Sequence, residues 1–336
     1  MESVKTDIVV VGAGPVGLFT VFQCGMLNMQ CHVVDSLPEI GGQCTALYPE
    51  KPIYDIPAQP VITGGDLITS LQAQAAPFNP TYHLGQQVVS LDKDGDVWHV
   101  TTSKDTKIEC KAIIIAAGAG AFGPNRPPLE NLDQYEDTSV FYMVRDRAQF
   151  TDKNIMIAGG GDSAIDWAIS LFDVAKKITV IHRRDKFRAM PESVAKMNEL
   201  AAQHPDKLEI ITPYQLSQLH GDNGVLNNVT LTSMNGDKRD VTTDALLAFY
   251  GLVPQLGPIA NWNLNLDGQT ITVDPSTCET SMPSIYAVGD IASYDKKLKL
   301  ILTGFAEVAS AAHDAHRYIH PDTALHFEYS TSKGVG

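Results

Sequence analysis

Three glycines and an acid near the start of the chain have the residue types and the spacing of a dinucleotide-binding loop. Gly12, Gly14 and Gly17 form a G-x-G-x-x-G pattern, and Asp35 follows 18 residues after Gly17. In this pattern the first glycine makes a tight turn, the second lets the backbone approach a pyrophosphate, and the third lets a helix pack closely on a strand. The N–H groups at the start of that helix bind phosphate oxygens, and the acid accepts hydrogen bonds from a ribose hydroxyl.

The residues around these glycines predict the elements that must position them. The apolar run 7–11 is typical of a buried parallel strand, an apolar-periodic helix follows the glycines, and residues 31–34 predict a second strand that ends at the acid. A glycine-rich turn without a ligand is the alternative. The complete order of strand, loop, helix, strand and acid favours a bound dinucleotide.

The same order returns later in the chain. Residues 154–158 predict a buried strand, 159–164 a second glycine-rich loop, 165–175 its helix and 178–181 the next strand. The chain therefore contains two similar nucleotide-binding units, one inserted into the other.

The second unit carries positive charge where the first has an acid. His182 stands at the position that Asp35 has in the first unit, and three arginines follow it within six residues. A carboxylate suits a ribose 2′-hydroxyl, whereas guanidinium groups suit a 2′-phosphate. Two charge-assisted contacts of roughly 1.5–3 kcal/mol each would favour NADPH over NADH by about 10²–10⁴-fold. A solvated basic turn is the alternative. The expected NADPH residues are Gly159, Gly161, Asp162, Ser163, Ala164, Arg183, Arg184 and Arg188.

A third motif indicates which dinucleotide the first unit binds. Within the segment 280–290, residues 285–288 predict a strand that Gly289 and Asp290 follow, and a long helix is expected from about residue 303 to 319. An acid at this strand end can bind the ribityl chain of a flavin, and the helix dipole can point at the flavin ring. This is the second FAD motif of flavoproteins with two dinucleotide domains, so we expect FAD in the first unit.

Length, charge and cysteine positions limit the number of domains, the partners and the kinds of site that the chain can have. A chain of 336 residues is long enough for two domains, and a net charge of −14 disfavours nucleic acid as a partner. No apolar run approaches the ~20 residues of a membrane span, and no signal peptide precedes the first strand, so we expect a cytoplasmic protein. The five cysteines, at 24, 31, 44, 110 and 278, include no C-x-x-C pair, so neither a disulfide framework nor a metal site is expected.

The chain resembles a known family over nearly its whole length. The segments that carry the similarity include GAGPVGL, GGQCTALYPEKPIYDIP, GGGDSAIDWA, IHRRDKFRA, YGLVPQLGPI, IYAVGD and LTGFAE. They are similar to those of the type 2, thioredoxin-reductase-like ferredoxin–NADP(+) reductases. The YPEKPIYD and LGPI segments are specific to that family.

The two units and the resemblance together predict an α/β fold of two Rossmann-like, three-layer ββα domains. The FAD-binding domain would comprise residues 1–120 and 251–336, and the inserted NADPH-binding domain residues 121–250. The connecting strands at 118–123 and 250–257 would allow the domains to rotate. The family is usually homodimeric, with the C-terminal segment near the partner's flavin.

The resemblance also implies flavin contacts. Tyr48 matches an aromatic residue that stacks on one face of the isoalloxazine, and Tyr329 matches one that covers the other face, where it would have to move before nicotinamide reaches N5. We therefore expect Tyr329 to gate hydride transfer. The implied FAD residues are Gly12, Gly14, Gly17, Asp35, Gln43, Tyr48, Val88, Phe122, Asp290, Tyr329 and Thr331.

Cysteine spacing separates this chain from its disulfide-reducing relatives. Thioredoxin reductases have a C-x-x-C just before the second glycine loop, but residues 141–146 here contain no sulfur. Glutathione-reductase-like enzymes need a second cysteine five positions after the one that Cys44 matches, and Pro49 stands there. A single Cys44 cannot cycle between dithiol and disulfide. We therefore expect a hydride from NADPH to reach flavin N5 and electrons to leave singly, with no side chain as acid, base or nucleophile.

The expected acceptor is ferredoxin or flavodoxin. Ferredoxins are acidic, so docking needs a local basic patch on this acidic protein. Other NADPH-dependent reductions, of quinones, ferric complexes or free flavin, remain open, as does a flavin-bearing sensor without enzymatic activity. The candidate basic patches are Arg145, Arg147 and Lys153, or Lys296, Lys297 and Lys299.

Overall fold

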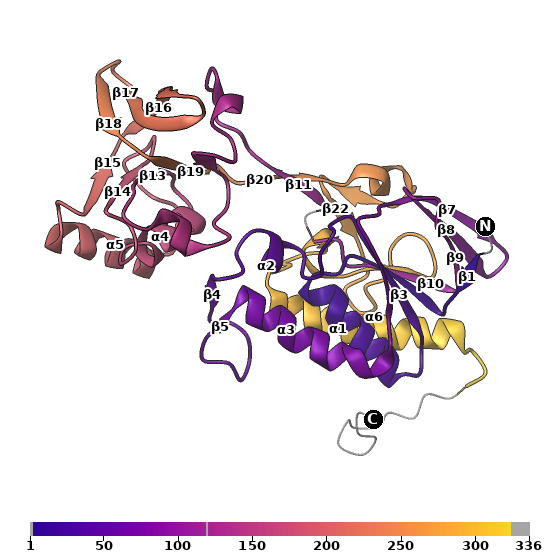
Figure 1. Ribbon diagram of the computed structural model, residues 1–336. Coiled ribbons are helices and arrows are strands. Elements are labelled where there is room, and N and C mark those ends of the chain that lie inside the picture. The colour runs from indigo at the N-terminus through magenta and orange to yellow at the C-terminus, as the bar shows by residue number, and fades with distance from the viewer. Residues whose placement is uncertain (1–2, 119, 324–336) are drawn as a thin grey trace. The chain divides into compact units, whose positions relative to one another are not determined.

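The chain folds into two compact units in a computed structural model that describes residues 3–118 and 120–323 (Figure 1). The first unit comprises Met1–Phe122 and Pro254–Gly336, and the second comprises Gly123–Val253. The second unit is therefore an insertion in the first.

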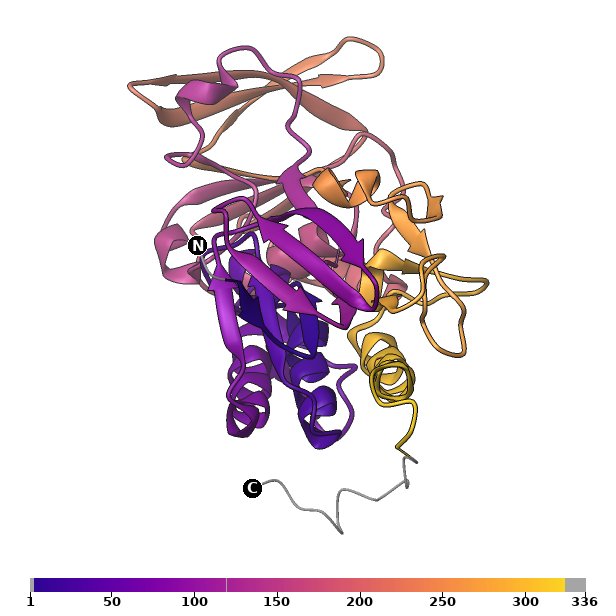
Figure 2. The ribbon, with the colours of Figure 1, turned by 90° about the vertical axis from the view of Figure 1, so that its right-hand side faces the viewer.

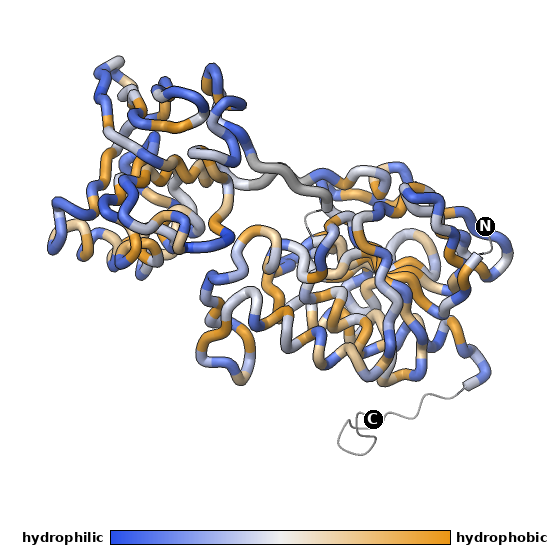
Figure 3. Tube along the Cα trace, viewed as in Figure 1, coloured by the Kyte–Doolittle hydropathy of each residue, from blue (hydrophilic) through white to orange (hydrophobic). Residues whose placement is uncertain are grey.

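A parallel five-stranded sheet forms the centre of the first unit. Its strand order is β23-β10-β2-β3-β6, and every neighbouring pair is parallel. All residues of β2 and β10 are buried, which explains their uninterrupted apolar sequences; the trace through them is orange in Figure 3. The strands are β2 (Ile8–Val11), β3 (Cys31–Asp35), β6 (Thr81–Leu84), β10 (Ala112–Ile115) and β23 (Ile285–Ala287).

Two further layers cover this sheet. Helices pack on one face, where Val21, Cys24 and Val308 join the core of the sheet. A mixed sheet of order β1-β9-β8-β7, antiparallel except for the parallel pair β1–β9, packs on the other face through Trp98 and Val100 (Figure 2). These elements are α1 (Pro15–Met26), α3 (Gly64–Ala75), α6 (Ile301–Ile319), β1 (Val4–Lys5), β7 (Val88–Asp94), β8 (Val97–Thr102) and β9 (Lys107–Cys110).

Shorter elements complete the first unit. The glycines and prolines of the segment 41–57 predict a loop, but the segment contains the one-turn helix α2. The short elements are α2 (Gln43–Ala46), β4 (Pro52–Ile53), β5 (Ile62–Thr63), η1 (Ala76–Phe78), η4 (Gly257–Asn261), β21 (Leu266–Asp267), β22 (Thr270–Thr272), η5 (Gly289–Ile291) and β24 (Ala292–Ser293).

The second unit repeats the plan. Its parallel sheet has the order β12-β19-β13-β14-β15, with the strand before the glycine loop again in the middle, and an antiparallel sheet β16-β17-β18 accompanies it. The elements are η2 (Leu132–Gln134), β12 (Val140–Phe141), η3 (Arg147–Phe150), β13 (Asn154–Gly159), α4 (Asp162–Ser170), β14 (Lys177–Ile181), α5 (Pro191–Gln203), β15 (Leu208–Ile211), β16 (Tyr214–Asp222), β17 (Val225–Ser233), β18 (Lys238–Thr242) and β19 (Ala245–Phe249).

The fold class predicted from the sequence is confirmed. Two Rossmann-like parallel sheets are present, and the second lies within an insertion in the first. The two segments that cross between the units, β11 (Ala121–Pro124) and β20 (Leu252–Gln255), pair with each other. Within the described residues, no helix has the length and apolar character needed to cross a membrane.

Candidate functional site

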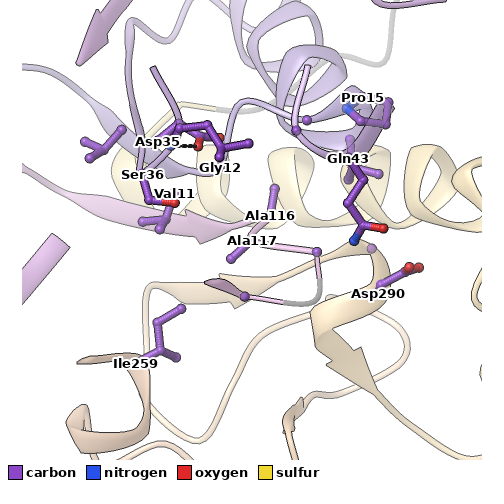
Figure 4. A pocket seen from close by; sticks show the side chains of 18 of the residues that line it. Val11, Gly12, Pro15, Asp35, Ser36, Gln43, Ala116, Ala117, Ile259 and Asp290 are labelled. Atoms are coloured by element: carbon purple, nitrogen blue, oxygen red, sulfur yellow. Dashed lines mark hydrogen bonds between the residues drawn. The ribbon is translucent and has the colours of Figure 1, made fainter. Parts of the chain in front are cut away.

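A pocket opens at the carboxyl edge of the parallel sheet in the first unit (Figure 4). Carboxyl ends of parallel strands share one edge, so the residues that follow β2, β3, β10 and β23 meet there. The residues from these strand ends are Val11, Gly12, Gly14, Val34, Asp35, Ser36, Leu37, Ala116, Ala117, Gly118, Gly120, Val288, Gly289 and Asp290.

The glycine loop between β2 and α1 is built for close approach. Gly12 has φ +113°, and a Cβ atom there would lie 2.4 Å from the carbonyl oxygen of Ala116. A Cβ atom at Gly17 would lie 1.9 Å from the carbonyl oxygen of Gly12, so Gly17 permits the helix to touch the turn. Gly14 instead faces open space, with no atom within 4 Å of an added Cβ. It is the N-cap of α1, and no side chain caps that helix. The helix start therefore offers N–H donors to an anion.

Asp35 fastens the end of β3 to this loop. Its Oδ2 accepts a hydrogen bond from the N–H of Ala13 at 2.6 Å, and its Oδ1 accepts one from the N–H of Leu37 at 2.7 Å. Burial raises the pKa of Asp35, and these two hydrogen bonds oppose the shift. Each carboxylate oxygen keeps a second lone pair for a ligand hydroxyl, so the side chain is both anchored and able to bind.

Side chains from α2 and η5 project into the same part of the pocket. Figure 4 shows Gln43 and Asp290 pointing toward a common space. Burial raises the pKa of Asp290, and Lys299 and Lys297 oppose that shift. Tyr48 lies beyond α2 and also lines the pocket. Together these groups supply an amide, a carboxyl and an aromatic ring.

The cysteine in the pocket is a protonated, buried thiol. Cys44 is 1% exposed, and burial raises its pKa to about 11. Its Sγ contacts the hydroxyl of Tyr48 at 4.0 Å. All five cysteines are buried and free. Cys24 and Cys31 hydrogen-bond to each other in the core between α1 and β3, and neither lines the pocket.

The structure brings together most of the residues that the sequence indicated for FAD. Gly17 supports the turn without lining the pocket. Phe122 falls in β11, and Tyr329 and Thr331, including the proposed gate, lie outside the described residues. The predicted residues that line the pocket are Gly12, Gly14, Asp35, Gln43, Tyr48, Val88 and Asp290.

Sequence reasoning missed the wall formed by distant segments. Gln86 and Gln87 follow β6, a strand that was not predicted; had Thr81–Leu84 been assigned as a strand, its carboxyl end would have pointed to them. Ile259 lies in η4, Leu256 and Trp262 flank this helix, and their apolar side chains carry no local signal of ligand binding.

The second unit has a corresponding glycine loop between β13 and α4. Gly161 is the N-cap of α4, has no side-chain cap, and has no atom within 4 Å of an added Cβ. A Cβ atom at Gly159 would lie 2.7 Å from the carbonyl oxygen of Phe249 and 3.0 Å from the Cβ of Ala164. Close packing and an open helix start therefore recur. The helix begins at Asp162 rather than at 165, so Asp162 and the exposed Ser163 occupy its first turn.

The arginine-bearing segment folds back onto this loop. The N–H of Arg188 donates to the carbonyl oxygen of Gly160 at 2.7 Å, and the N–H of Met190 donates to Oδ1 of Asp162 at 2.8 Å. Arg183, Arg184 and Arg188 are all exposed. The segment that carries these arginines is thus held against the glycine loop, and the loop has three exposed cationic residues beside it in the chain.

His182 lies beneath the glycine loop. A Cβ atom at Gly160 would lie 2.3 Å from the imidazole of His182, and Phe187 stacks on that ring with centroids 5.4 Å apart. Burial lowers the pKa of His182, and the charges of Arg188, Arg183 and Arg184 lower it further. A neutral imidazole therefore replaces the carboxylate of the first unit, and it adds no negative charge that would repel a phosphate.

One candidate docking patch needs correction. Lys297 was expected to be exposed, but its side chain is 6% exposed and forms an ion pair with Glu307. Lys296 and Lys299 are exposed and precede Ile301, which lines the pocket. Arg147 donates to the carbonyl oxygen of Ser170. Among the described residues, no group of three or more His, Cys, Asp and Glu side chains could hold a metal ion.

Comparisons with known proteins match this architecture. A family model described as pyridine nucleotide-disulphide oxidoreductase matches residues 6–316. The ferredoxin–NADP reductase of Rhodospirillum rubrum is 56% identical over 98% of this chain and 96% of that protein. The one from Paramagnetospirillum magneticum is 56% identical over 100% and 99%. The solved thioredoxin reductase of Lactococcus lactis superimposes with a TM-score of 0.80 at 24% identity, covering 94% of this chain and 99% of that one.

Proposed function

The chain belongs to the pyridine nucleotide-disulphide oxidoreductases and, among them, to the ferredoxin–NADP reductases, and on this premise we propose that it carries electrons between NADPH and ferredoxin or flavodoxin. Members of this family use FAD and NADPH. The observation that carries the proposal is the pair of open, uncapped helix starts, one with a carboxylate beside it and one with guanidinium groups. We propose that the route has no redox-active disulfide.

FAD would be held at the pocket of the first unit. The start of α1 would bind the pyrophosphate, Asp35 would accept from a ribose hydroxyl, and Asp290 would accept from the ribityl chain. Tyr48 would stack against the ring system, a contact of about 0.5–1.5 kcal/mol. When bound, FAD accepts a hydride at N5 and releases electrons singly.

NADPH would be held at the second unit. The start of α4 would bind its pyrophosphate, and Arg183, Arg184 and Arg188 would bind the 2′-phosphate as charge-assisted hydrogen-bond donors. His182, neutral and buried, would hold the shape of this site without opposing the phosphate charge.

The positions of the cysteines support the proposal that no redox-active disulfide takes part in electron transfer. All are buried, and the one in the pocket has no second thiol among the pocket residues. Electrons would therefore leave directly from the flavin. Exposed Lys296 and Lys299, near the pocket residue Ile301, are the basic groups that we propose for an acidic ferredoxin. We further propose that the enzyme is a cytoplasmic homodimer, which light scattering of the purified protein can test.

Two matched valine substitutions test the assignment of the two sites. Gly14→Val and Gly161→Val each place a side chain where the protein has no atom within 4 Å, at φ −71° and −100° that valine tolerates. We expect Gly14→Val to lose bound FAD, and Gly161→Val to keep FAD while losing reduction by NADPH. Each variant is the control for the other. Full FAD binding in Gly14→Val would contradict the first assignment.

The acceptor is tested by comparing rates of NADPH oxidation with ferredoxin, flavodoxin, a quinone and thioredoxin. We expect the highest kcat/KM with ferredoxin or flavodoxin and no reduction of thioredoxin. Turnover with the quinone alone would instead indicate a general NADPH-dependent flavin reductase. A protein that is yellow with bound flavin but shows no NADPH oxidation with any of these acceptors would indicate a sensor.

A further inference from the structure

A buried carboxylate on α6 holds the turn that carries Asp290. Oε2 of Glu307 accepts a hydrogen bond from the N–H of Gly289 at 2.7 Å, and its Oε1 accepts one from the hydroxyl of Tyr294 at 2.7 Å. The side chain is 6% exposed. Gly289 and Asp290 line the pocket, whereas Glu307 does not. A single hydrogen bond therefore connects Glu307 to the pocket wall.

A buried lysine balances the charge on Glu307. The Nζ of Lys297 pairs with Oε1 of Glu307, and the lysine side chain is also 6% exposed. The same ammonium lies over the ring of Tyr294, 5.3 Å from its centroid. A buried charge pair therefore stands directly behind the turn, shielded from the solvent that would otherwise screen it.

The packing leaves this turn little room to move. A Cβ atom at Gly289 would lie 3.3 Å from Cγ2 of Val16, which is in the first turn of α1. A Cβ atom at Gly304 would lie 2.5 Å from the same methyl group and 3.3 Å from Cα of Gly289. The turn is thus held between the starts of α1 and α6, and a change at Glu307 reaches both.

We propose that Glu307 is a positioning residue for the flavin end of the pocket and that the opposite charges of Lys297 and Glu307 balance each other behind it, so that neither charge shifts the reduction potential of the bound flavin. This inference rests on the proposed placement of FAD. Reduction adds negative charge to the flavin, so an unbalanced positive charge behind the turn favours the reduced form and an unbalanced negative charge disfavours it. With both charges present, their effects largely cancel.

Three variants separate the charge effect from loss of structure. Glu307→Gln leaves the lysine unbalanced, Lys297→Met leaves the carboxylate unbalanced, and the double variant is neutral again. We expect the equilibrium constant for two-electron reduction to rise about tenfold in Glu307→Gln and to fall about tenfold in Lys297→Met, each a shift of ~30 mV, with the double variant near wild type. The matched control is Lys177→Met with Glu209→Gln, an ion pair of 2.9 Å in the second unit.

The measurement is the flavin potential of the holoenzyme, together with the rate of FAD release. Opposite shifts in the two single variants support the inference, and Lys297→Met alone decides the sign if Glu307→Gln does not fold. Suppose that the wild-type protein binds FAD and reduces ferredoxin. Unchanged flavin potentials in the two single variants, or shifts of the same sign, would then overturn this inference and leave the proposed function standing. A wild-type protein without FAD would overturn both.

Discussion

The N–H of Arg188 donates a hydrogen bond to the carbonyl oxygen of Gly160 at 2.7 Å, which fastens the arginine-bearing segment to the second glycine loop. The backbone makes this link, so the exposed guanidinium groups of Arg183, Arg184 and Arg188 are not used for it. The arginine-bearing segment is thus held against the loop from which α4 begins, and its three guanidinium groups remain exposed.

Replacing Arg183 and Arg184 with alanine should reduce the preference for NADPH over NADH. Each charge-assisted contact is worth roughly 1.5–3 kcal/mol, so losing two should lower the ratio of kcat/KM values by about 10²–10⁴-fold. Steady-state kinetics with ferricyanide as acceptor measure this ratio. Lys186→Ala removes an exposed charge from the same segment and should keep the wild-type ratio. An unchanged ratio in the double variant would disprove the assignment.

The thermal stability of the holoenzyme should fall as the pH is lowered from about 7 to about 5. Nδ1 of His32 lies 3.1 Å from Nε2 of His83 on the adjacent strand. Burial lowers the pKa of both, and the charge of His83 lowers the pKa of His32 further. Because each pKa is lower in the folded state than in the unfolded state, the unfolded chain binds more protons as pH falls through this range, and stability is lost.

A series of threonine substitutions measures how much the two histidines contribute to the pH dependence of the melting temperature. His83→Thr should flatten the dependence of the melting temperature on pH, and His32→Thr with His83→Thr should flatten it more. His182, whose pKa is also lowered, should preserve part of the slope. The full wild-type slope in the double variant would rule out the pair as a source.

The thiols of the native holoenzyme should react slowly with Ellman's reagent at pH 8, whereas all five should react in denaturant. The five are buried, and burial raises the pKa of Cys44 to about 11 and those of Cys110 and Cys278 to about 12. The thiolate is the reactive form, so little of it is present.

Turnover should not depend on any cysteine pair. Cys44→Ala should keep ferredoxin reduction within a few-fold of wild type. The double variant Cys24→Ala and Cys31→Ala should do so too, although the loss of core volume should lower its melting temperature. A loss of turnover of 100-fold or more in a folded double variant that retains FAD would show that these adjacent thiols act in electron transfer.

Reversing the charges of Lys296 and Lys299 to glutamate should weaken ferredoxin reduction at low salt. Exposed pairs contribute up to about 1 kcal/mol each, so kcat/KM should fall roughly tenfold, and its decline with rising salt should become shallower. Ferricyanide reduction serves as the internal reference. Lys111→Glu alters an exposed lysine just before β10, at the opposite edge of the sheet from the pocket, and should have no comparable effect.

Local patterns were enough to predict the fold class and the two glycine loops. Gly12, Gly17 and Gly159 are glycines because backbone or Cβ atoms lie within 3 Å of where their Cβ would be. Glycines at such positions can be recognised from the sequence pattern. The alternating residues 97–102 and 107–110 also predict strands from the local pattern alone, and β8 and β9 have these bounds.

Tertiary contacts decided the rest. Lys297 looks like an exposed charge in its own segment, and only Glu307 on α6 explains its burial. Ile259 in η4 and Trp262 just after it line the pocket, far along the chain from the glycine loop. The helix α2 forms in a segment whose glycines and prolines argue against one, with Gly42 at φ +57° as its N-cap. No periodicity in the sequence could have indicated these.

The pairing of β11 with β20 has a consequence for how such a molecule can be rebuilt. The chain leaves the first unit and returns to it on two hydrogen-bonded strands, so the two cut ends lie about one strand spacing, ~4.8 Å, apart. A tight turn could therefore replace everything between Gly120 and Gln255 and leave a stand-alone yellow module. Conversely, a different domain whose N- and C-termini are adjacent could be inserted between Gly120 and Gln255.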